Sequence, residues 1–588
     1  MMDIEDRVGL VPGSGTSQPG IEPLGRLLAV TGSQVVVKFT SDLSLPGEAS
    51  VDITVGSLLG IRTGEALAIG ALCDISLEDS PSDNFGSHAT GRVDLLGEIV
   101  EDDAGERRFH RGVMVYPTLG SAVVPIGSEE LQIVFDLANP QTIEVGRLQH
   151  NGSLAAYVNV DEIVRKHFAI VGGTGAGKSS SLALILRKII EARSDLRMLV
   201  IDAHNEYGEC FADRAHVFGP DNFPLPFWLF NFDEIVEIIF GQRARSEREV
   251  ALLAELIPLA KSEYARTRGA LRASYRPSDT DRGRYAVDTP VPYRIEDVVA
   301  LAESRMGKLE NSDIAVQYQR LLMRIHAVRR NPRYAFIFED AGKSDGKAGD
   351  TMVDILSGLL RLGDDEQPMA VVQLAGFPAE TMEVIVSVLF RLAFEFGVWS
   401  DGASPLLIVC EEAHNYANAD RAMGFQPARE GLSRIAKEGR KHGVFLGLVT
   451  QRPHQLDPTL ISQCSTVFAM RLGHEEDQKI IRAAVSDSGS RLLAFLPSLG
   501  TREALVIGAG VPTVMRLRFE ELPACFIPRS QAVWGCGPEG GQHIDEQWVA
   551  SIVARWRGTT AAANPAPRVA MPGSKSFGNE AGSWELPT

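Results

Sequence analysis

From about residue 150 to residue 520, short apolar runs alternate with stretches of helical periodicity. The apolar runs lie at 168–171, 197–202, 369–374, 405–410 and 444–450, and their near-continuous hydrophobicity indicates buried strands. Strands that alternate with helices are typical of a parallel sheet joined by crossover helices. We therefore predict an α/β fold whose core occupies residues 149–233 and 331–520.

The pattern before this core is different. Between residues 22 and 148, short β-type runs at 33–39, 66–72 and 112–117 are separated by turns, with hardly a helical stretch among them. Such spacing predicts a small β-barrel or sandwich, with an irregular β-rich cap as the alternative. Residues 1–21 are rich in Gly, Ser and Pro, so we predict a flexible N-terminus.

Two further segments interrupt or follow the core. Residues 234–330 have a helical pattern rich in arginine, which predicts a helical insertion whose basic residues face DNA or a partner, or only solvent. Residues 521–588 form a C-terminal extension that turns rich in Ala, Pro, Gly and Ser after about 558. This composition predicts a disordered tail or a strap lying on a neighbouring molecule.

Composition narrows the class of protein. The 588 residues carry a net charge of −18, which argues against a generally basic nucleic-acid coat but permits DNA binding inside a narrow channel. The six cysteines show no C-x-x-C spacing, and no apolar run approaches the ~20 residues that a membrane span needs. We expect a cytoplasmic, multidomain protein without a membrane partner.

Residues 172–179 match the pattern G-x-x-x-x-G-K-[ST], between a predicted strand and a predicted helix. Glycines in this position let backbone N–H groups surround a polyphosphate, and the positive end of the helix faces the same anion. The pattern predicts a nucleotide site with ATP and Mg²⁺ as cofactors, in which the serine hydroxyl binds the metal. The predicted nucleotide-binding residues here are Gly173, Thr174, Gly175, Ala176, Gly177, Lys178, Ser179 and Ser180.

An acidic pair follows the apolar run at 405–410. A P-loop site needs one acid near the Mg²⁺ ion and a base to orient the attacking water. We assign Glu411, together with Ser179, to the metal shell and Glu412 to the polarisation of water. The two glutamates could also exchange these roles.

Three other polar residues stand at the ends of predicted elements. Asp202 ends a strand, which places Asp202, His204 and Glu206 to enter the site. The alternative is that Asp202 only caps a following helix. Gln451 also ends a strand, where it can contact the γ-phosphate or serve only as a turn residue. Arg440 lies at the end of a helix, which favours a cation there, and it is also a candidate arginine finger for a neighbouring subunit.

With these pieces in order, the chain resembles the HerA family of hexameric ATPases, relatives of the FtsK DNA translocases. The likeness extends from about 22 to 520 and is strongest at 166–172, 202–207, 411–414, 438–443 and 450–453. The resemblance implies a RecA/FtsK-like P-loop core, an N-terminal barrel that helps subunits associate, and a homohexamer. It also implies ATP hydrolysis at subunit interfaces, with double-stranded DNA in the central channel.

The resemblance also extends to single residues. Arg440 matches the arginine that the family contributes to the neighbouring subunit, and Lys166 falls where the family often has a basic residue near the nucleotide. Two positions depart from the family pattern. Gln373 stands where the family commonly has an acid, and Glu411 stands where many P-loop proteins have aspartate, so the rate of hydrolysis could differ.

Two functions remain open at this stage. The first is an ATP-driven DNA translocase or helicase that serves a separate effector docked on the barrel, either a nuclease or a sirtuin-like enzyme, in phage defence or DNA end processing. The second is a ring scaffold that assembles and activates an effector with little translocation. A rotary ATPase, suggested by a barrel before a P-loop, fits the Glu-Glu-Ala-His and Thr-Gln-Arg-Pro segments less well.

Overall fold

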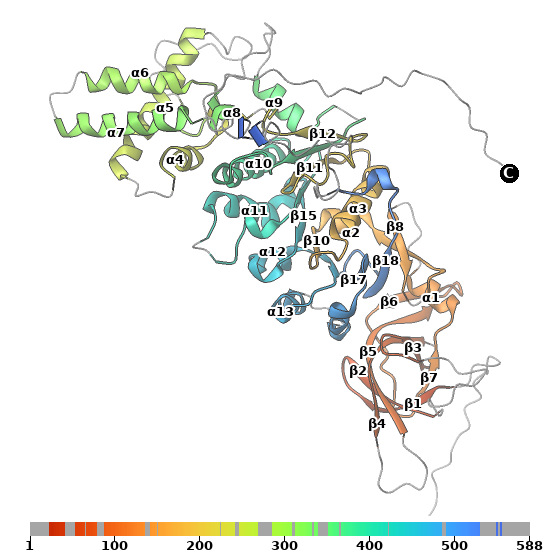
Figure 1. Ribbon diagram of the computed structural model, residues 1–588. Helices are drawn as coiled ribbons and strands as arrows, with labels where there is room; N and C mark the ends of the chain where they lie inside the picture. Colours follow the sequence, from red (N-terminus) through yellow and green to blue (C-terminus); the bar gives the residue numbers. More distant parts are fainter. Residues whose placement is uncertain are drawn as a thin grey trace, which may run out of the picture.

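The structure is a computed structural model that describes most residues between 23 and 529, and four residues between 549 and 554. The longer internal gaps are at 41–52, 79–87, 269–284 and 339–350. A barrel, a central sheet flanked by helices and a helical bundle follow one another along the molecule (Figure 1). The predicted flexible N-terminus and the tail after 558 lie outside the described residues.

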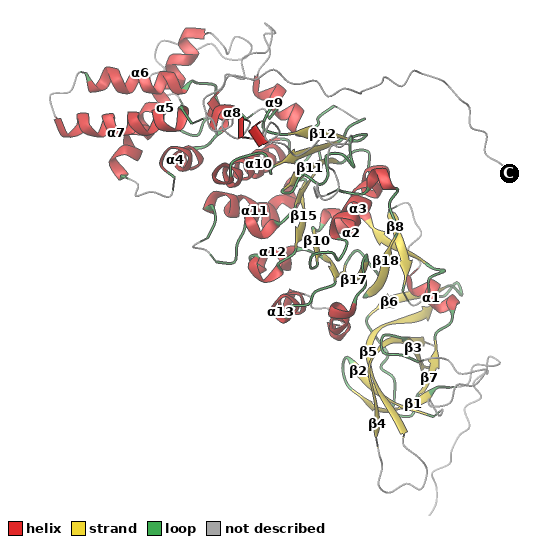
Figure 2. Cartoon of the chain, viewed as in Figure 1, coloured by secondary structure: helices red, strands yellow, loops and turns green. Residues whose placement is uncertain are grey.

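The barrel comes first in the chain and consists almost entirely of strands (Figure 2). In the described residues its sheet has seven strands, and pairing of the second strand with the fifth closes six of them into a ring. The strands are β1 (Gly25–Val30), β2 (Gln34–Phe39), β3 (Leu58–Thr63), β4 (Ala66–Glu78), β5 (His88–Glu101), β6 (Arg107–Arg111) and β7 (Ala122–Pro125). Side chains of alternating strand positions, including Val37, Ile61 and Val93, fill its interior.

One predicted barrel strand is wrong. Residues 112–117 form a loop, not a strand. Gly112, at a φ of 85°, turns the chain away from the sheet, and Met114 and Val115 are 87% and 58% exposed. The run has the composition of a strand, but the side chains of Met114 and Val115 lie on the surface of the barrel.

The central sheet has eleven strands in the described residues, in the order β12-β13-β11-β14-β15-β10-β16-β17-β18-β8-β9. The strands from β12 to β16 in this order are parallel, as predicted, whereas the last four are antiparallel. The strands are β8 (Thr142–Leu148), β9 (Ala155–Asn159), β10 (Phe168–Val171), β11 (Arg197–Asp202), β12 (Ala215–Phe218), β13 (Met369–Gln373), β14 (Leu406–Cys410), β15 (Val444–Thr450), β16 (Thr466–Met470), β17 (Glu503–Gly508) and β18 (Met515–Phe519).

The boundary between the barrel and the central sheet lies earlier in the chain than the sequence pattern predicts. Strand β8 lies within the segment assigned to the barrel, yet it pairs with β18 of the central sheet. The last barrel strand ends at Pro125, and helix α1 (Ser128–Phe135) follows it. Arg111 of the barrel donates to the carbonyls of Gly508 and Pro512 in the core, at 3.0 and 3.1 Å.

Helices cover the faces of the central sheet (Figure 2). Helix α10 packs along α11, and both contact β15. The helices of this part are α2 (Val160–Arg165), α3 (Lys178–Ala192), α10 (Ala379–Trp399), α11 (Gln426–Glu438), α12 (Pro458–Gln463) and α13 (Glu475–Ala484). None of the helices in the described residues is long and apolar enough to cross a membrane.

The predicted insertion is helical and projects from the end of the sheet opposite the barrel (Figure 1). Its helices are α4 (Phe232–Phe240), α5 (Glu247–Arg268), α6 (Ile295–Met306) and α7 (Ser312–Arg329), followed by α8 (Ala335–Phe338) and α9 (Thr351–Leu359). An ion pair of 2.9 Å joins the buried Glu249 of α5 to the partly exposed Arg324 of α7. Burial lowers the pKa of Lys261 to about 8, and its Nζ donates to the carbonyl of Thr289 at 2.8 Å.

Candidate active site

The loop at 172–179 joins β10 to α3 at the carboxyl end of the parallel strands. Gly175 and Gly177 have φ values of 73° and 96°, a left-handed conformation that side chains disfavour. Gly177 is the N-cap of α3 and provides no side-chain cap, so the N–H groups of the first turn are free to bind an anion. This geometry fits the phosphates of a nucleotide.

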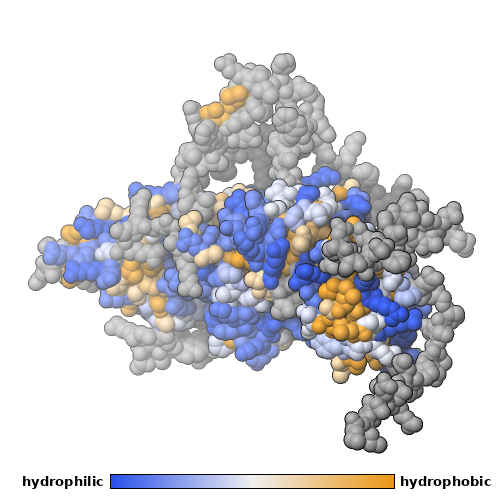
Figure 3. All heavy atoms as spheres, turned by 90° about the horizontal axis from the view of Figure 1, so that it is seen from below, coloured by the Kyte–Doolittle hydropathy of each residue, from blue (hydrophilic) through white to orange (hydrophobic). Residues whose placement is uncertain are grey.

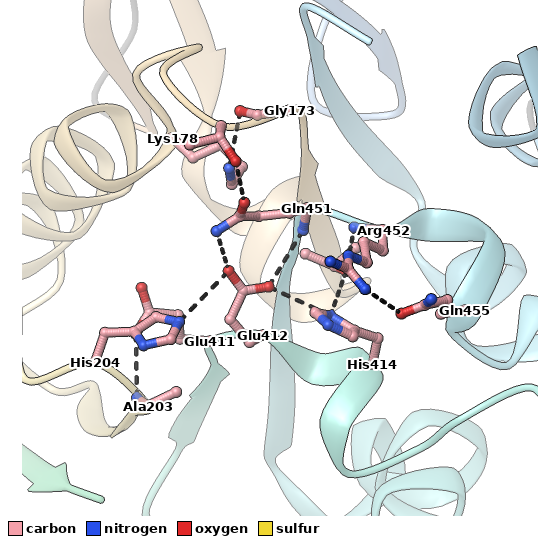
Figure 4. A network of polar contacts seen from close by, with 12 residues as sticks. Gly173, Lys178, Ala203, His204, Glu411, Glu412, His414, Gln451, Arg452 and Gln455 are labelled. Atoms are coloured by element: carbon pink, nitrogen blue, oxygen red, sulfur yellow. Dashed lines mark hydrogen bonds and ion pairs between the residues drawn. The ribbon is translucent and has the colours of Figure 1, made fainter. Parts of the chain in front are cut away.

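Lys178 begins the helix and points back into the loop (Figure 4). Its side chain is buried, and Nζ donates to the carbonyl of Gly173 at 3.1 Å. Burial lowers the pKa of Lys178, while the carboxylates of Glu412, Glu411 and Glu206 act in the opposite direction. The ammonium group therefore stands between the phosphate-binding loop and a cluster of acids.

Glu412 and Gln451 form the centre of a polar network (Figure 4). Glu412 accepts hydrogen bonds from the side-chain amide of Gln451 and from its backbone N–H, the latter at 3.3 Å. The amide oxygen of Gln451 in turn accepts from the hydroxyl of Thr174 in the P-loop, at 2.7 Å. The structure thus brings together three residues that the sequence placed in the site separately.

Glu412 has an unusual backbone conformation. Its φ and ψ are both 47°, in the left-handed region that costs a residue other than glycine about 1 kcal/mol or more. The side chain is only 6% exposed, and it lies between two histidines. His414 Nδ1 lies 3.3 Å and His204 Nε2 3.9 Å from the carboxylate (Figure 4).

Sequence reasoning placed His204 at the site, with Asp202 and Glu206, but gave His414 no role of its own. His414 Nδ1 is also 3.1 Å from the hydroxyl of Thr450, which accepts from the N–H of Arg452. Burial lowers the pKa of His414, so its ring is neutral near pH 7. Its place three residues after Glu411, directly beyond a buried strand, is the signal that could have identified it.

Glu411 and Asp202 form a second, deeper acidic pair. Burial raises the pKa of Glu411 to about 9, with smaller contributions from the charges of Asp202, Glu206 and Glu412. Burial also raises the pKa of Asp202, and a hydrogen bond joins the two carboxyl groups. Both carboxyl groups therefore favour their protonated forms more than an exposed acid does. A cation beside them would favour the ionised form.

Asp202 also stabilises the turn that carries His204. Its carboxyl oxygens accept from the backbone N–H groups of Glu206 and Tyr207, at 3.0 and 2.9 Å. Glu411 accepts from the N–H of Ala203 at 3.1 Å. Asp202 is fully buried. Its hydrogen bonds with two backbone N–H groups resemble those of a capping residue, the alternative role that the sequence offers for it.

Arg440 and Lys166 lie at the opposite edge of the sheet, where the parallel strands begin. Arg440 belongs to a short 3₁₀ helix, η4 (Gly439–His442), that precedes β15, and its guanidinium donates to the carbonyls of Lys166, at 2.7 Å, and Gln463. The ammonium of Lys166 pairs with Glu162 at 2.6 Å. Lys166 is therefore not a ligand of the P-loop in its own chain, because the whole of β10 separates the two.

Two arginines near the P-loop were missed. The N–H of Gly173 donates to the carbonyl of Arg471 at 2.8 Å, and the Arg471 guanidinium approaches the carbonyl of Gly175 at 3.4 Å. The N–H of Arg502 donates to the carbonyl of Ala176 at 2.8 Å. Arg471 directly follows β16, so the rule that strand ends face the ligand could have found it.

Comparison with known proteins agrees with this geometry. Residues 143–393 match the family model of the HerA helicase central domain. A probable helicase of Methanocaldococcus jannaschii is 24% identical over 82% of this chain and 88% of its own. The HerA double-strand break repair helicase of Pyrococcus furiosus is 25% identical, over 74% of this chain and 77% of its own.

The chain is therefore similar to HerA-type helicases in its central domain and, at 24% identity, over most of its length. The HerA helicase of Sulfolobus acidocaldarius matches it over 86% of this chain and 93% of its own, at 24% identity. Among solved structures, VirB4 of Thermoanaerobacter pseudethanolicus is similar with a TM-score of 0.44 and 15% identity, over 65% of this chain and 97% of that one. The match to the HerA central domain covers the P-loop and Asp202 of this chain but ends before Glu411.

Proposed function

We propose that the protein is a homohexameric motor that hydrolyses ATP to move along or unwind double-stranded DNA. Its relatives in P. furiosus and S. acidocaldarius carry the name of DNA double-strand break repair helicases. One observation supports a ring in particular. The P-loop, Glu412 and Gln451 lie at the carboxyl edge of the sheet, whereas Arg440 lies at the other edge. Head-to-tail packing of subunits would bring the two edges together.

In this proposal each residue has a defined task. Residues 173–180 surround the triphosphate, which the N–H groups in the first turn of α3 bind, and Lys178 neutralises charge at the β- and γ-phosphates. Ser179 and Glu411 offer the hard oxygen ligands that Mg²⁺ prefers, and a bound Mg²⁺ ion would supply Lewis-acid stabilisation of the phosphate charge. Glu412 orients the attacking water and accepts its proton. Gln451, between Glu412 and Thr174, detects the γ-phosphate.

The motor function is tested by DNA-dependent hydrolysis. We expect long duplex DNA to stimulate ATP hydrolysis, and strand displacement to depend on Lys178. The Lys178→Ala variant should lose both activities, whereas Lys188→Ala, on the same helix but outside the loop, should retain them. Hydrolysis that does not respond to duplex DNA would contradict the motor function.

The trans role of Arg440 has its own test. A ring of Arg440→Ala subunits lacks the donated arginine but has intact P-loops, and a ring of Lys178→Ala subunits has the reverse defect. Because neighbours share each site, coexpression of the two variants should restore part of the activity. Mixed rings as inactive as the pure variants would show that Arg440 does not act on its neighbour.

The barrel end is the proposed docking site for a separate effector, a nuclease or a sirtuin-like enzyme, in phage defence or DNA end processing. Seen from below, hydrophobic residues gather over this end of the molecule (Figure 3). Large exposed hydrophobic patches are typical of protein interfaces. The apolar side chains that the barrel exposes include Leu28, Leu77, Met114, Val115 and Leu119.

The same patch favours a second candidate, a ring scaffold that holds and regulates the effector with little translocation. The two functions differ in what the nucleotide does. If Lys178→Ala rings assemble and fully activate the copurified effector, the scaffold function is supported and the motor function is contradicted. If effector activity falls together with DNA translocation, the motor is supported.

A further inference from the structure

His167 has an exceptional position at the edge of the sheet that carries Arg440. Its φ is 59°, which is rare for a residue with a side chain, and its side chain is completely buried. Left-handed residues of this kind cost about 1–3 kcal/mol and persist where the surrounding structure requires them. The proposed chemistry of the P-loop uses neither this conformation nor this imidazole.

The contacts of His167 join three segments. Its Nδ1 accepts from the backbone N–H of Leu446 in β15 at 3.0 Å. The N–H of Ser465, just before β16, donates to the carbonyls of Lys166 and His167, at 3.0 and 3.1 Å. Thus His167 connects the beginning of β10 with its two neighbouring strands.

Arg440 is attached to the same turn. Its Nη2 donates to the carbonyl of Lys166 at 2.7 Å, the peptide that immediately precedes His167. The left-handed turn at His167 therefore determines where this carbonyl points. Burial lowers the pKa of His167 to about 4, with a smaller contribution from the charge of Arg440. The ring is therefore neutral near pH 7. A neutral ring can accept the Leu446 hydrogen bond without repelling the guanidinium.

We propose that His167 is a positioning residue that orients Arg440 toward the active site of the neighbouring subunit. The inference rests on the proposed function, in which Arg440 acts in trans. Its basis is the chain of contacts from Leu446 through His167 to the carbonyl of Lys166 and from there to Arg440.

The same contacts connect this edge with the subunit's own site. Strand β10 begins directly after His167 and ends at the P-loop, while β15 begins after Arg440 and ends directly before Gln451. The two strands pair in parallel over their common length, from Phe168 opposite Gly447 to Val171 opposite Thr450. Two short, buried strands thus connect the P-loop and Gln451 with the edge that carries Arg440.

Two variants separate positioning from folding. Asparagine tolerates a left-handed φ, and its side-chain oxygen can accept from the N–H of Leu446, so His167→Asn retains the turn and one contact. His167→Ala loses both. We expect His167→Ala to lower kcat at least about tenfold with the KM for ATP changed by less than about twofold, because misplacing a charge by 1 Å can cost about 10²-fold. His167→Asn should regain most of kcat.

The decisive readout is complementation in mixed rings. His167→Ala subunits keep an intact P-loop, and Lys178→Ala subunits keep a correctly placed Arg440. In coexpressed rings about a quarter of the junctions combine the two intact halves, so activity should recover to the level seen for Arg440→Ala with Lys178→Ala. The control Ile257→Ala changes a fully buried residue of α5, far from this contact chain, and any activity that it loses should not recover in this way.

The two mixtures separate the role of His167 from the role of Arg440. Recovery of both the His167→Ala and the Arg440→Ala mixtures supports the proposal. If the Arg440→Ala mixture recovers but the His167→Ala mixture does not, the trans arginine stands and the positioning role of His167 is refuted. If neither mixture recovers, Arg440 does not act in trans, and the proposal for His167 falls with it.

Discussion

At the scale of single residues, Glu412 is the group whose surroundings are most specialised. It is buried, its backbone is left-handed, and it accepts two hydrogen bonds from Gln451. Because an amide of the same shape cannot accept a proton from water, Glu412→Gln should bind ATP with near-normal affinity but hydrolyse it about 10²- to 10³-fold more slowly. Single-turnover hydrolysis and equilibrium nucleotide binding measure the two effects separately.

The control for this change is Glu209→Gln, which removes an exposed carboxylate a few residues beyond the turn that Asp202 stabilises. It should leave hydrolysis within about twofold of the wild type, because a surface carboxylate outside the network contributes little. If Glu412→Gln turns over normally, another carboxylate orients the water, and Glu411 becomes the first candidate.

Because His167 is buried as a neutral ring, we predict that the free energy of unfolding depends on pH. Its pKa is lowered from 6.5 to about 4 in the folded chain, so the folded state binds fewer protons than the unfolded state between these values. The contribution of His167 to the free energy of unfolding is therefore fully present above about pH 6.5 and is lost as the pH falls toward 4. The difference in unfolding free energy between wild type and His167→Asn should narrow by about 2 kcal/mol between pH 7 and pH 5.

Urea unfolding of the two proteins at both pH values measures this difference. The comparison with the variant is essential, because buried carboxyls such as Glu411, whose pKa is raised, respond to pH in the opposite direction in both proteins. A gap between the two proteins that stays constant with pH would mean that the imidazole titrates alike in the folded and unfolded chains.

At the scale of elements, the close packing of β10 on β15 should be sensitive to one added methyl group. A Cβ at Gly447 would lie 2.6 Å from the ring of Phe168, which is fully buried and packs edge-on against Phe468. Gly447→Ala should therefore destabilise the protein by about 1–3 kcal/mol and also slow hydrolysis, because it displaces the strand that carries Gln451 relative to the P-loop. Thermal unfolding and kcat measure the two effects.

Gly358 in α9 provides the matched control, since a Cβ there meets nothing within 4 Å. Gly358→Ala should be neutral or slightly stabilising, because alanine favours a helix over glycine by about 1 kcal/mol. A Gly447→Ala protein as stable and active as this control would show that the two strands can move apart without consequence.

Strand β10 also explains which parts of the molecule the sequence could predict. Parallel strands buried on both faces are continuous apolar runs, so 168–171 and 444–450 were recognised correctly. The antiparallel strands β17 and β18 were not predicted, and 112–117 was misassigned because exposed apolar residues share the pattern of buried ones. Burial is a tertiary property that a short window does not contain.

The same distinction holds for the candidate site. The P-loop and the acidic pair form local patterns, and Gln451 follows a predicted strand, so each could be named from the sequence. The contacts that join Thr174, Gln451 and Glu412 link positions up to 277 residues apart, and they need the strand order of the sheet. Lys166 is close to the P-loop in sequence but lies beyond the far end of β10, which only the fold reveals.

At the scale of the whole molecule, the edge of the central sheet opposite the P-loop carries exposed positive charge. The 3₁₀ helix η4 exposes Arg440 and Lys441 there. In the proposed ring these cations face the nucleotide phosphates bound by the neighbouring subunit, which favours head-to-tail association. Because exposed charges are screened by salt, ring assembly should weaken as ionic strength rises.

Trp399 gives this surface an apolar anchor. It is the last residue of α10 and is 87% exposed. The end of α10 lies beside η4, where the ring of Phe394 packs edge-on against His442 with 5.6 Å between centroids. Exposed tryptophans at such surfaces are often the residues that contribute most to binding. We expect Trp399 to lie in the interface between ring subunits.

The Trp399→Ala variant should therefore raise the dissociation constant of ring assembly about tenfold or more, because truncation of an interface tryptophan typically costs more than about 1.4 kcal/mol. Sedimentation velocity over a range of protein concentrations measures the shift. Met323→Ala, which removes a side chain that is 58% exposed on α7, should leave assembly unchanged. If the Met323 variant dissociates and the Trp399 variant does not, the subunits meet through the helical insertion, and Arg440 would no longer face a neighbour's nucleotide.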